Sequence, residues 1–273
     1  MLAKCVLSCL LAWAAAPMAA QQPTAIATPT SIADRALLDL QRQAEAGVAQ
    51  AQYRLALAYE RGDGVARDLS AAVHWYSIAA NHGFPPAQNN LAAMYAGGTG
   101  VIKDESAARR WYTRAAVEGD ATAQNNLGTL YANSSTPGHD QEAVHWFRKA
   151  AHLGFAPAMA NLAYMYSQGR GVATSAQEAA RYYEAAAQAG FVPAMEVIGF
   201  RYADGIGIRR DPAAAIRWLE RPAREGSQAA AAKMIVLLDQ LADAGDAEAR
   251  RQAASWRERT SSGRNSSGQN QPR

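Results

Sequence analysis

Residues 87–119 read AQNNLAAMYAGGTGVIKDESAARRWYTRAAVEG and predict two helices joined by a short glycine-rich loop. Ala87, Leu91 and Tyr95 recur every four residues, so they share one face of the first helix. Three glycines among the next five residues end that helix, and they can adopt the positive φ angles of a tight connection. Asp104 is placed to cap the second helix, whose apolar face includes Trp111. Such a hairpin leaves two faces half covered, so it requires neighbours of the same kind.

The rest of the chain repeats this unit every 35 or 36 residues. A glycine marks the end of each unit at positions Gly47, Gly83, Gly119, Gly154, Gly190 and Gly226. An aromatic residue of the second helix keeps the same period, as Trp75, Trp111, Trp146, Tyr182 and Trp218. A period in the thirties with two helices in each unit is typical of a solenoid, in which each repeat buries its faces on its neighbours.

The residues of the unit also resemble a known repeat. The pattern Ala-x-x-x-Leu-x-x-x-Tyr, then Gly-x-Gly-Val, then Ala-x-x-Trp-Tyr-x-x-Ala-Ala-x-x-Gly resembles the Sel-one-like repeat, a relative of the tetratricopeptide repeat with a longer loop. The resemblance implies an all-α fold, a right-handed α/α superhelical solenoid of helix–loop–helix repeats. We expect repeats at 47–82, 83–118, 119–153, 154–189 and 190–225. A helix at 34–46 and a helix pair at 226–259 are expected to cap the two ends.

Helix starts and departures from the pattern refine this prediction. Four polar residues stand seven positions before the aromatic residue, where an N-cap belongs: Asp68, Asp104, Ser175 and Asp211. Repeat three lacks the Gly-x-Gly-Val loop and is one residue shorter, and we expect Asp140 to cap its second helix. Pro222 lies inside the second helix of repeat five and predicts a kink or an early end there.

The first twenty residues predict a secretory signal peptide. Lys4 supplies the positive charge, residues 5–16 form the apolar core, and small residues favour cleavage near Ala20, with residues 25–27 as a later alternative. Twelve apolar residues are too few to span a bilayer, so we expect no integral membrane segment after cleavage. The predicted localisation is therefore the periplasm or the exterior of a bacterial cell.

Both cysteines fall inside this signal peptide, so the mature chain is expected to have no disulfide or reactive thiol. Lipidation of Cys9 is the disfavoured alternative, because the cysteine precedes the end of the apolar core. Residues 21–33, rich in Thr, Pro and Ala, predict a flexible linker, and residues 260–273 predict a disordered tail.

Composition argues against a nucleic-acid partner. The net charge is +3, and basic and acidic residues are interspersed along the chain instead of forming a basic patch. The hydrophobic content is 49% with only 8% aromatic residues, because much of it is alanine, which favours helices.

Motifs for chemistry are absent from the sequence. Four loops contain Gly-x-Gly, but each joins two helices and none extends to Gly-x-Gly-x-x-Gly, so we interpret them as tight turns. The five histidines include no H-E-x-x-H pair, and neither Ser-x-x-Lys nor Gly-x-Ser-x-Gly occurs. The sequence predicts no catalytic residue, no metal site and no cofactor, although carboxylate pairs that meet only in space stay open.

Two variable series on the first helices mark the predicted binding surface. The first runs Arg54, Asn90, Asn126, Asn161 and Val197, and the second, three residues later, runs Leu57, Ala93, Thr129, Tyr164 and Phe200. Asparagine is unfavourable inside helices, so its repetition requires a reason: it either braces the neighbouring loop or binds an extended peptide. The predicted binding residues are Arg54, Asn90, Asn126, Asn161, Thr129, Tyr164 and Phe200. The tryptophan series is expected to lie in the core.

These observations predict an exported protein–protein interaction scaffold or adaptor of the bacterial cell envelope. It would bind a protein or peptide partner on the surface lined by the first helices, within an envelope-associated complex. One alternative is a cell-wall or β-lactam hydrolase, since some secreted members of the family that the chain resembles are associated with such activity. Those relatives are rich in cysteine, which the mature chain lacks. A structural brace that contacts peptidoglycan is the other alternative.

Overall fold

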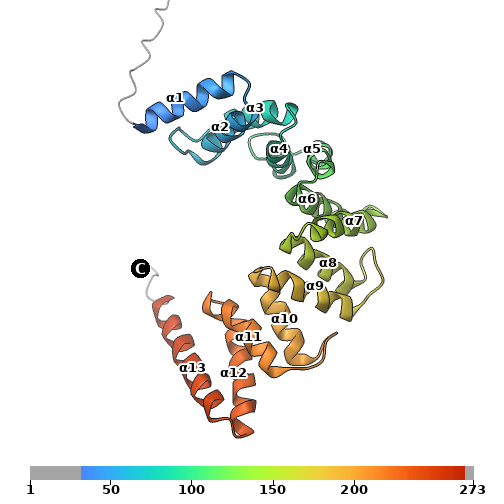
Figure 1. The fold of residues 1–273 in the computed structure, drawn as a ribbon, viewed down its shortest axis with the longest axis vertical. Coiled ribbons are helices and arrows are strands. Elements are labelled where there is room, and N and C mark those ends of the chain that lie inside the picture. Colours follow the sequence, from blue (N-terminus) through green and yellow to red (C-terminus); the bar gives the residue numbers. More distant parts are fainter. Residues whose placement is uncertain (1–31, 268–273) are drawn as a thin grey trace, which may run out of the picture.

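The computed structural model describes residues 32–267, which form thirteen α-helices and no β-strand (Figure 1). The predicted signal peptide and residues 21–31 of the predicted linker lie outside the described residues. The helices are α1 (Ile32–Glu45), α2 (Ala49–Arg61), α3 (Leu69–Asn81), α4 (Pro85–Gly97), α5 (Glu105–Val117), α6 (Ala121–Ala132), α7 (His139–His152), α8 (Ala156–Gln168), α9 (Ala176–Gln188), α10 (Val192–Asp204), α11 (Pro212–Arg224), α12 (Gln228–Asp243) and α13 (Ala247–Ser267).

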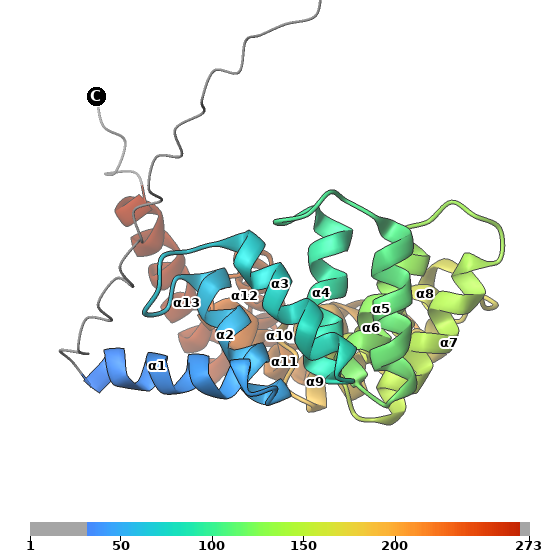
Figure 2. The same cartoon turned by 90° about the horizontal axis from the view of Figure 1, so that it is seen from above.

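Each helix packs mainly on the helices that precede and follow it in the chain, as the predicted all-α solenoid requires. We call α2, α4, α6, α8, α10 and α12 the first helices, and their partners α3, α5, α7, α9, α11 and α13 the second helices. Figure 1 shows an open arc with α1 and α13 at its two ends, and with α4 and α6 on the inner side of α5 and α7. Figure 2 shows α4 and α5 side by side, with their loop at one edge of the solenoid.

The core contains at least one large apolar residue from each helix of each repeat. The first helices contribute Leu55, Leu91, Leu127, Leu162 and Ile198, and the second helices contribute Tyr76, Tyr112, Phe147, Tyr183 and Leu219. The predicted aromatic series lies one residue earlier, and of its members only Trp146 is fully buried, while the others are half-buried. The prediction that the tryptophans form the core is therefore only partly correct. The residue that follows each member of the aromatic series is the more buried one.

The predicted N-caps are confirmed at four second helices. The carboxylate of Asp68 accepts hydrogen bonds from the backbone N–H groups of Ser70 and Ala71, at 2.9 and 3.0 Å. The side chains that cap the other three helices are Asp104, Ser175 and Asp211. The prediction for Asp140 is wrong, because Gly138 stands at the N-cap with φ +86° and makes no side-chain cap. Asp140 instead binds Arg170 through a 2.6 Å ion pair.

Two further expectations are wrong, an early end of the helix that contains Pro222 and disorder from residue 260, while a kink at Pro222 stays a prediction. The helix that contains Pro222 does not end early, since α11 runs to Arg224 and has the same 13 residues as α9. Proline removes one backbone donor, but Pro222 is buried on the packed face and only two residues follow it in the helix. Residues 260–267 are helical as well, because α13 continues to Ser267. The rest of the predicted disordered tail lies outside the described residues.

The Gly-x-Gly loops are tight turns, as predicted, and their second glycine has a packing role. A Cβ added at Gly100 would lie 2.7 Å from the carbonyl oxygen of Leu69, the first residue of α3. The equivalent distance is 2.3 Å from Gly171 to Asp140 and 2.0 Å from Gly207 to Ala176. Each of these loops therefore sits directly on the start of the second helix of the preceding repeat, where only glycine fits.

Three buried glutamines hold successive repeats together. Gln52, Gln88 and Gln124 are at most 5% exposed, and each donates its amide N–H to the carbonyl of the residue eight positions earlier. That carbonyl lies in the last turn of the preceding helix, so the glutamine satisfies a backbone acceptor that the helix end leaves partly open. The first helices of the last two repeats carry Met159 and Met195 at this position instead.

Candidate functional site

All seven predicted binding residues lie on first helices, so the structure brings them to one side of the solenoid. Arg54 is on α2, and Asn90 is on α4. Two members each come from α6 (Asn126 and Thr129) and α8 (Asn161 and Tyr164), and Phe200 is on α10. In Figure 1, α4 and α6 are on the inner side of the arc, so their members of the set belong to the concave half of the molecule.

The asparagines form a ladder between neighbouring first helices. The amide of Asn126 donates to the side-chain oxygen of Asn89 at 3.0 Å, and the amide of Asn161 donates to that of Asn125 at 2.9 Å. Within each helix, Asn89 donates to Asn90 at 3.2 Å and Asn125 donates to Asn126 at 3.5 Å. The amides thus link α8, α6 and α4 in one continuous series.

The series ends on a buried tyrosine and a carboxylate. Asn90 donates to the hydroxyl of Tyr76 at 3.1 Å, and this hydroxyl donates to Glu60 at 2.5 Å. Burial raises the pKa of Tyr76 above its usual value, and the hydrogen bond to Glu60 raises it further. All donors in the series point towards Glu60, so the ladder is polarised from α8 towards α2.

This ladder gives the asparagines a role that neither explanation from the sequence included, while peptide binding stays a prediction. The asparagines do not brace a loop, and much of their hydrogen-bonding capacity is used between helices. They hold the spacing of the first helices and so stiffen the surface they line. At the α8 end, the side-chain oxygen of Asn161 receives no hydrogen bond from any residue that the structure describes. Asn89 and Asn125 are not among the predicted binding residues, although the recurring Asn-Asn pairs at 89–90 and 125–126 were a signal for them.

The second predicted series, which includes Thr129, Tyr164 and Phe200, has members that differ in solvent exposure. Tyr164 is 47% exposed and lies one helical turn after Asn161, so its ring adjoins the open end of the ladder. Phe200 is half-buried and packs against the cluster that contains Leu219 and Leu237, which leaves it less available than the sequence suggested. Thr129 is half-buried and donates to the backbone carbonyl of Asn125 at 3.0 Å. Arg54 is exposed.

A cavity of about 420 Å³ opens beside the ladder, and two predicted residues, Asn126 and Thr129, line it. Its other walls include Lys103 and Tyr112, which come from the α4–α5 loop and from α5. We call this cavity the loop-gap pocket. No sequence motif marked Tyr112 as a site residue, because its position is a core position in every repeat.

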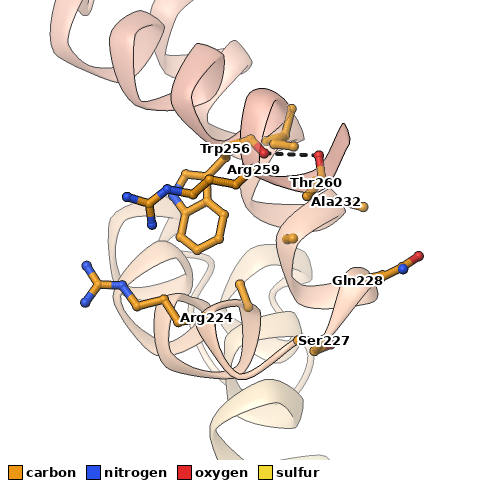
Figure 3. Close-up of a pocket in the computed structure, with 11 residues that line it drawn as sticks. Arg224, Ser227, Gln228, Ala232, Trp256, Arg259 and Thr260 are labelled. Atoms are coloured by element: carbon orange, nitrogen blue, oxygen red, sulfur yellow. Dashed lines mark hydrogen bonds between the residues drawn. The ribbon is translucent and has the colours of Figure 1, made fainter. Parts of the chain in front are cut away.

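A second cavity, of about 530 Å³, lies at the C-terminal end between α11, α12 and α13 (Figure 3). The guanidinium of Arg259 lies 5.2 Å from the centre of the Trp256 ring, and Arg224 stands across the opening from them in Figure 3. Arg224 forms an ion pair with Glu220 at 2.5 Å. None of the predicted binding residues lines this cavity, so it is separate from the ladder.

Within residues 32–267, no group of three or more His, Cys, Asp or Glu side chains is arranged to hold a metal ion. In the same part of the chain, no helix is long and apolar enough to cross a membrane.

Comparisons with known proteins agree with the repeat geometry. The family model described as the Sel1 repeat matches five segments: 49–84, 85–120, 121–155, 156–191 and 192–227. These begin two residues after the predicted repeats and keep their period. No curated protein matches the chain.

Two solved structures are similar over most of the chain. A protective antigen of uropathogenic Escherichia coli strains with an SLR fold is 31% identical with a TM-score of 0.67, and the match covers 78% of this chain and 50% of the antigen. The chain therefore spans half the length of that relative. A Sel1 repeat protein from Oxalobacter formigenes is 30% identical with a TM-score of 0.64, and the match covers 81% of this chain and 99% of that protein.

Proposed function

The chain belongs to the Sel1 repeat family, and we propose that it is an exported interaction scaffold that binds a protein or peptide partner. Solenoids of this family are commonly protein-interaction scaffolds and are generally not catalytic. The partner binds across the first helices, and the complex forms in the periplasm or outside the bacterial cell. The predicted signal peptide supports this location.

One observation carries the proposal: the open end of the asparagine ladder adjoins an exposed aromatic ring. The side-chain oxygen of Asn161 accepts no hydrogen bond within residues 32–267, and Tyr164 exposes 47% of its surface one turn further along α8. Tyrosine combines a large apolar ring with a hydroxyl group, and such residues are prominent among the binding hot spots of interfaces. A backbone N–H of the partner can donate to Asn161 while an apolar side chain packs on Tyr164.

The ladder also explains why this surface is suited to binding. Side-chain amides that are already fixed by hydrogen bonds lose little conformational entropy when a partner arrives. The inter-helix hydrogen bonds from α8 to α4 keep the rungs in register, so the surface is organised before binding.

The proposal is tested by affinity capture from an envelope extract of the source bacterium, using the tagged full chain as bait. Tyr164→Ala removes the exposed ring, and we expect it to reduce capture by about tenfold or more, as for an aromatic hot spot. Leu153→Ala is the matched control, because Leu153 is 58% exposed but follows the second helix α7, away from the ladder. Equal capture by the Tyr164→Ala bait and the wild-type bait would place the binding surface elsewhere.

The location has its own test. Expression of the full chain in a Gram-negative host, followed by cell fractionation and mass spectrometry of its N-terminus, should give a mature chain that starts near Gln21 in the periplasm or the medium. An unprocessed chain in the cytoplasm would contradict export.

A further inference from the structure

The loops between the two helices of each repeat have a defined seat in the preceding repeat. The second glycine of three such loops approaches the first or second residue of a second helix: Gly100 on Leu69, Gly171 on Asp140 and Gly207 on Ala176. An added Cβ would lie within 2.7 Å of the helix carbonyl in all three cases, so the contact is main chain on main chain. Four second helices have a full repeat after them, and three of these therefore carry a seated loop.

The fourth seat, at the start of α5, is the exception. Glu105 is the residue equivalent to Leu69, 36 positions later, and the loop that should cover it belongs to repeat three. That repeat has Asn133-Ser134-Ser-Thr-Pro-Gly138 in place of the Gly-x-Gly-Val loop. The loop-gap pocket of about 420 Å³ lies here, and both Glu105 and the first residues of the altered loop line it.

The same pocket holds a tyrosine that lacks the partners of its counterpart. In the preceding repeat, the hydroxyl of Tyr76 donates to Glu60 and accepts from Asn90. The equivalent of Tyr76 is Tyr112, and Ala96 stands where the acceptor Glu60 would be.

The donor is missing as well. Asn126, which is equivalent to Asn90, donates to Asn89 instead of to the tyrosine. The Tyr112 hydroxyl therefore has no hydrogen-bond partner among residues 32–267. Tyr112 is only 6% exposed, and burial raises its pKa to about 12.

The charges at the rim of the pocket favour an uncharged occupant. Lys103 and Glu105 form a 2.8 Å ion pair, and the hydrogen bond from Lys103 lowers the pKa of Glu105. The two charges satisfy each other, so a charged ligand would have to compete with that pair. The other polar groups of the wall are neutral amides and hydroxyls, among them Asn126, Thr129 and Asn133.

We propose that the loop-gap pocket binds a glycine-containing turn of a partner polypeptide, which takes the place of the missing loop of repeat three. The turn places its glycine against the start of α5, as Gly100 and Gly171 do on α3 and α7. One of its backbone carbonyls accepts the hydrogen bond of the Tyr112 hydroxyl. The volume lies in the range of about 300–1,000 Å³ that is usual for ligand sites. This inference rests on the proposed function and adds the chemistry of the bound segment.

The chain itself supplies an uncharged probe, because residues 98–102, GTGVI, lie in the seated loop of repeat two. A backbone-cyclised peptide containing GTGVI is titrated into the ¹⁵N-labelled full chain and followed by NMR. The control peptide is identical except that alanine replaces both glycines. We expect saturable shifts of the amides of Tyr112, Asn126, Asn133 and Ser134 with the glycine peptide, and binding at least about tenfold weaker with the control.

Two variants make the test specific. Ala96→Glu restores the acceptor that Glu60 provides to Tyr76 and fills part of the pocket, and Tyr112→Phe removes only the hydroxyl. Both should weaken peptide binding by about tenfold or more, and Tyr112→Phe serves alone if Ala96→Glu does not fold. The inference is overturned by an absence of shifts at millimolar peptide, by equal binding of the two peptides, or by unchanged affinity of Tyr112→Phe. Tighter binding of N-acetylglucosamine, a sugar of peptidoglycan, than of the peptide would also overturn it.

The outcome is separable from that of the proposed function. Tyr164→Ala leaves the loop-gap pocket intact, so this variant should still bind the cyclic peptide while it loses partner capture. Failure of peptide binding together with Tyr164-dependent capture would refute the pocket inference alone.

Discussion

The seating of glycine loops predicts a graded loss of stability when the second glycine of each loop becomes alanine. The four positions Gly64, Gly100, Gly171 and Gly207 have nearly the same φ, between +68° and +74°. They differ in what an added Cβ would meet. At Gly64 there is nothing within 4 Å, whereas at Gly207 the carbonyl oxygen of Ala176 lies at 2.0 Å.

The loss of stability has two parts, the strain of an alanine at positive φ and the clash of its Cβ with the preceding repeat. Placing an alanine in the left-handed region costs about 1–2 kcal/mol, and the lower entropy of the unfolded alanine chain offsets about 0.4–1 kcal/mol of this. That net cost is common to all four sites, so Gly64→Ala should destabilise by about 1 kcal/mol. At Gly207 the loop must also move off α9, and overpacking of this kind adds about 1–3 kcal/mol. The expected order of destabilisation is Gly64, then Gly100, then Gly171, then Gly207.

Urea denaturation followed by far-UV circular dichroism measures the free energy of unfolding of each variant. Repeats of a solenoid can unfold separately, so the slope with urea must match that of the wild type before the values are compared. Amide hydrogen exchange in the helix before each loop then checks that the loss is local. Equal destabilisation of Gly64→Ala and Gly207→Ala would refute the seating argument, because the backbone strain alone would then account for both.

Three further predictions concern the core and the inter-repeat contacts. Burial raises the folded-state pKa of Tyr112 to about 12 from 10.0, so its neutral form contributes stability below pH 10 that is lost as the pH rises to 12. The urea midpoint should therefore decline less steeply over this pH range in Tyr112→Phe than in the wild type. An equal decline in both proteins would contradict the prediction. Gln124→Ala should lower the free energy of unfolding, measured by urea denaturation, by about 1–2 kcal/mol because the hydrogen bond to Ala116 is lost. Gln124→Met should lower it by less, since methionine occupies this position in the last two repeats. The reverse order would be inconsistent with the packing of those repeats. Phe147→Ala should lower the free energy of unfolding by about 3–5 kcal/mol and Trp111→Ala by less, since Phe147 is 2% exposed and Trp111 is half-buried. A larger loss for Trp111→Ala in the same assay would argue against this assignment of the core.

Much of the fold follows from the sequence because its determinants are local. The four-residue spacing of Ala87, Leu91 and Tyr95 specifies a helix face, and Asp68 caps α3 through its own neighbours along the chain. Where a local rule competed with packing, the prediction failed. Pro222 does not shorten α11, since it lies near the helix end on a buried face. Asp140 does not cap α7, since it is held by Arg170 from the next repeat.

The sequence predicted on which helices the candidate residues lie, but not which hydrogen bonds they form. The period of 36 residues correctly placed Asn90, Asn126 and Asn161 on one series of first helices. Their hydrogen-bond partners could not be read from it, because each rung joins side chains about 36 residues apart whose distance depends on the spacing of adjacent helices.

The sequence by itself therefore determined the repeat, its helices and most of their caps, because these depend on residues within one or two turns of each other. Only the tertiary structure decided how the repeats meet. It seats Gly207 on Ala176, links the asparagines of neighbouring first helices, and leaves the hydroxyl of Tyr112 without a hydrogen-bond partner among the described residues. These features depend on distances of a few ångströms between side chains of different repeats, and such distances are set by the packing of whole helices.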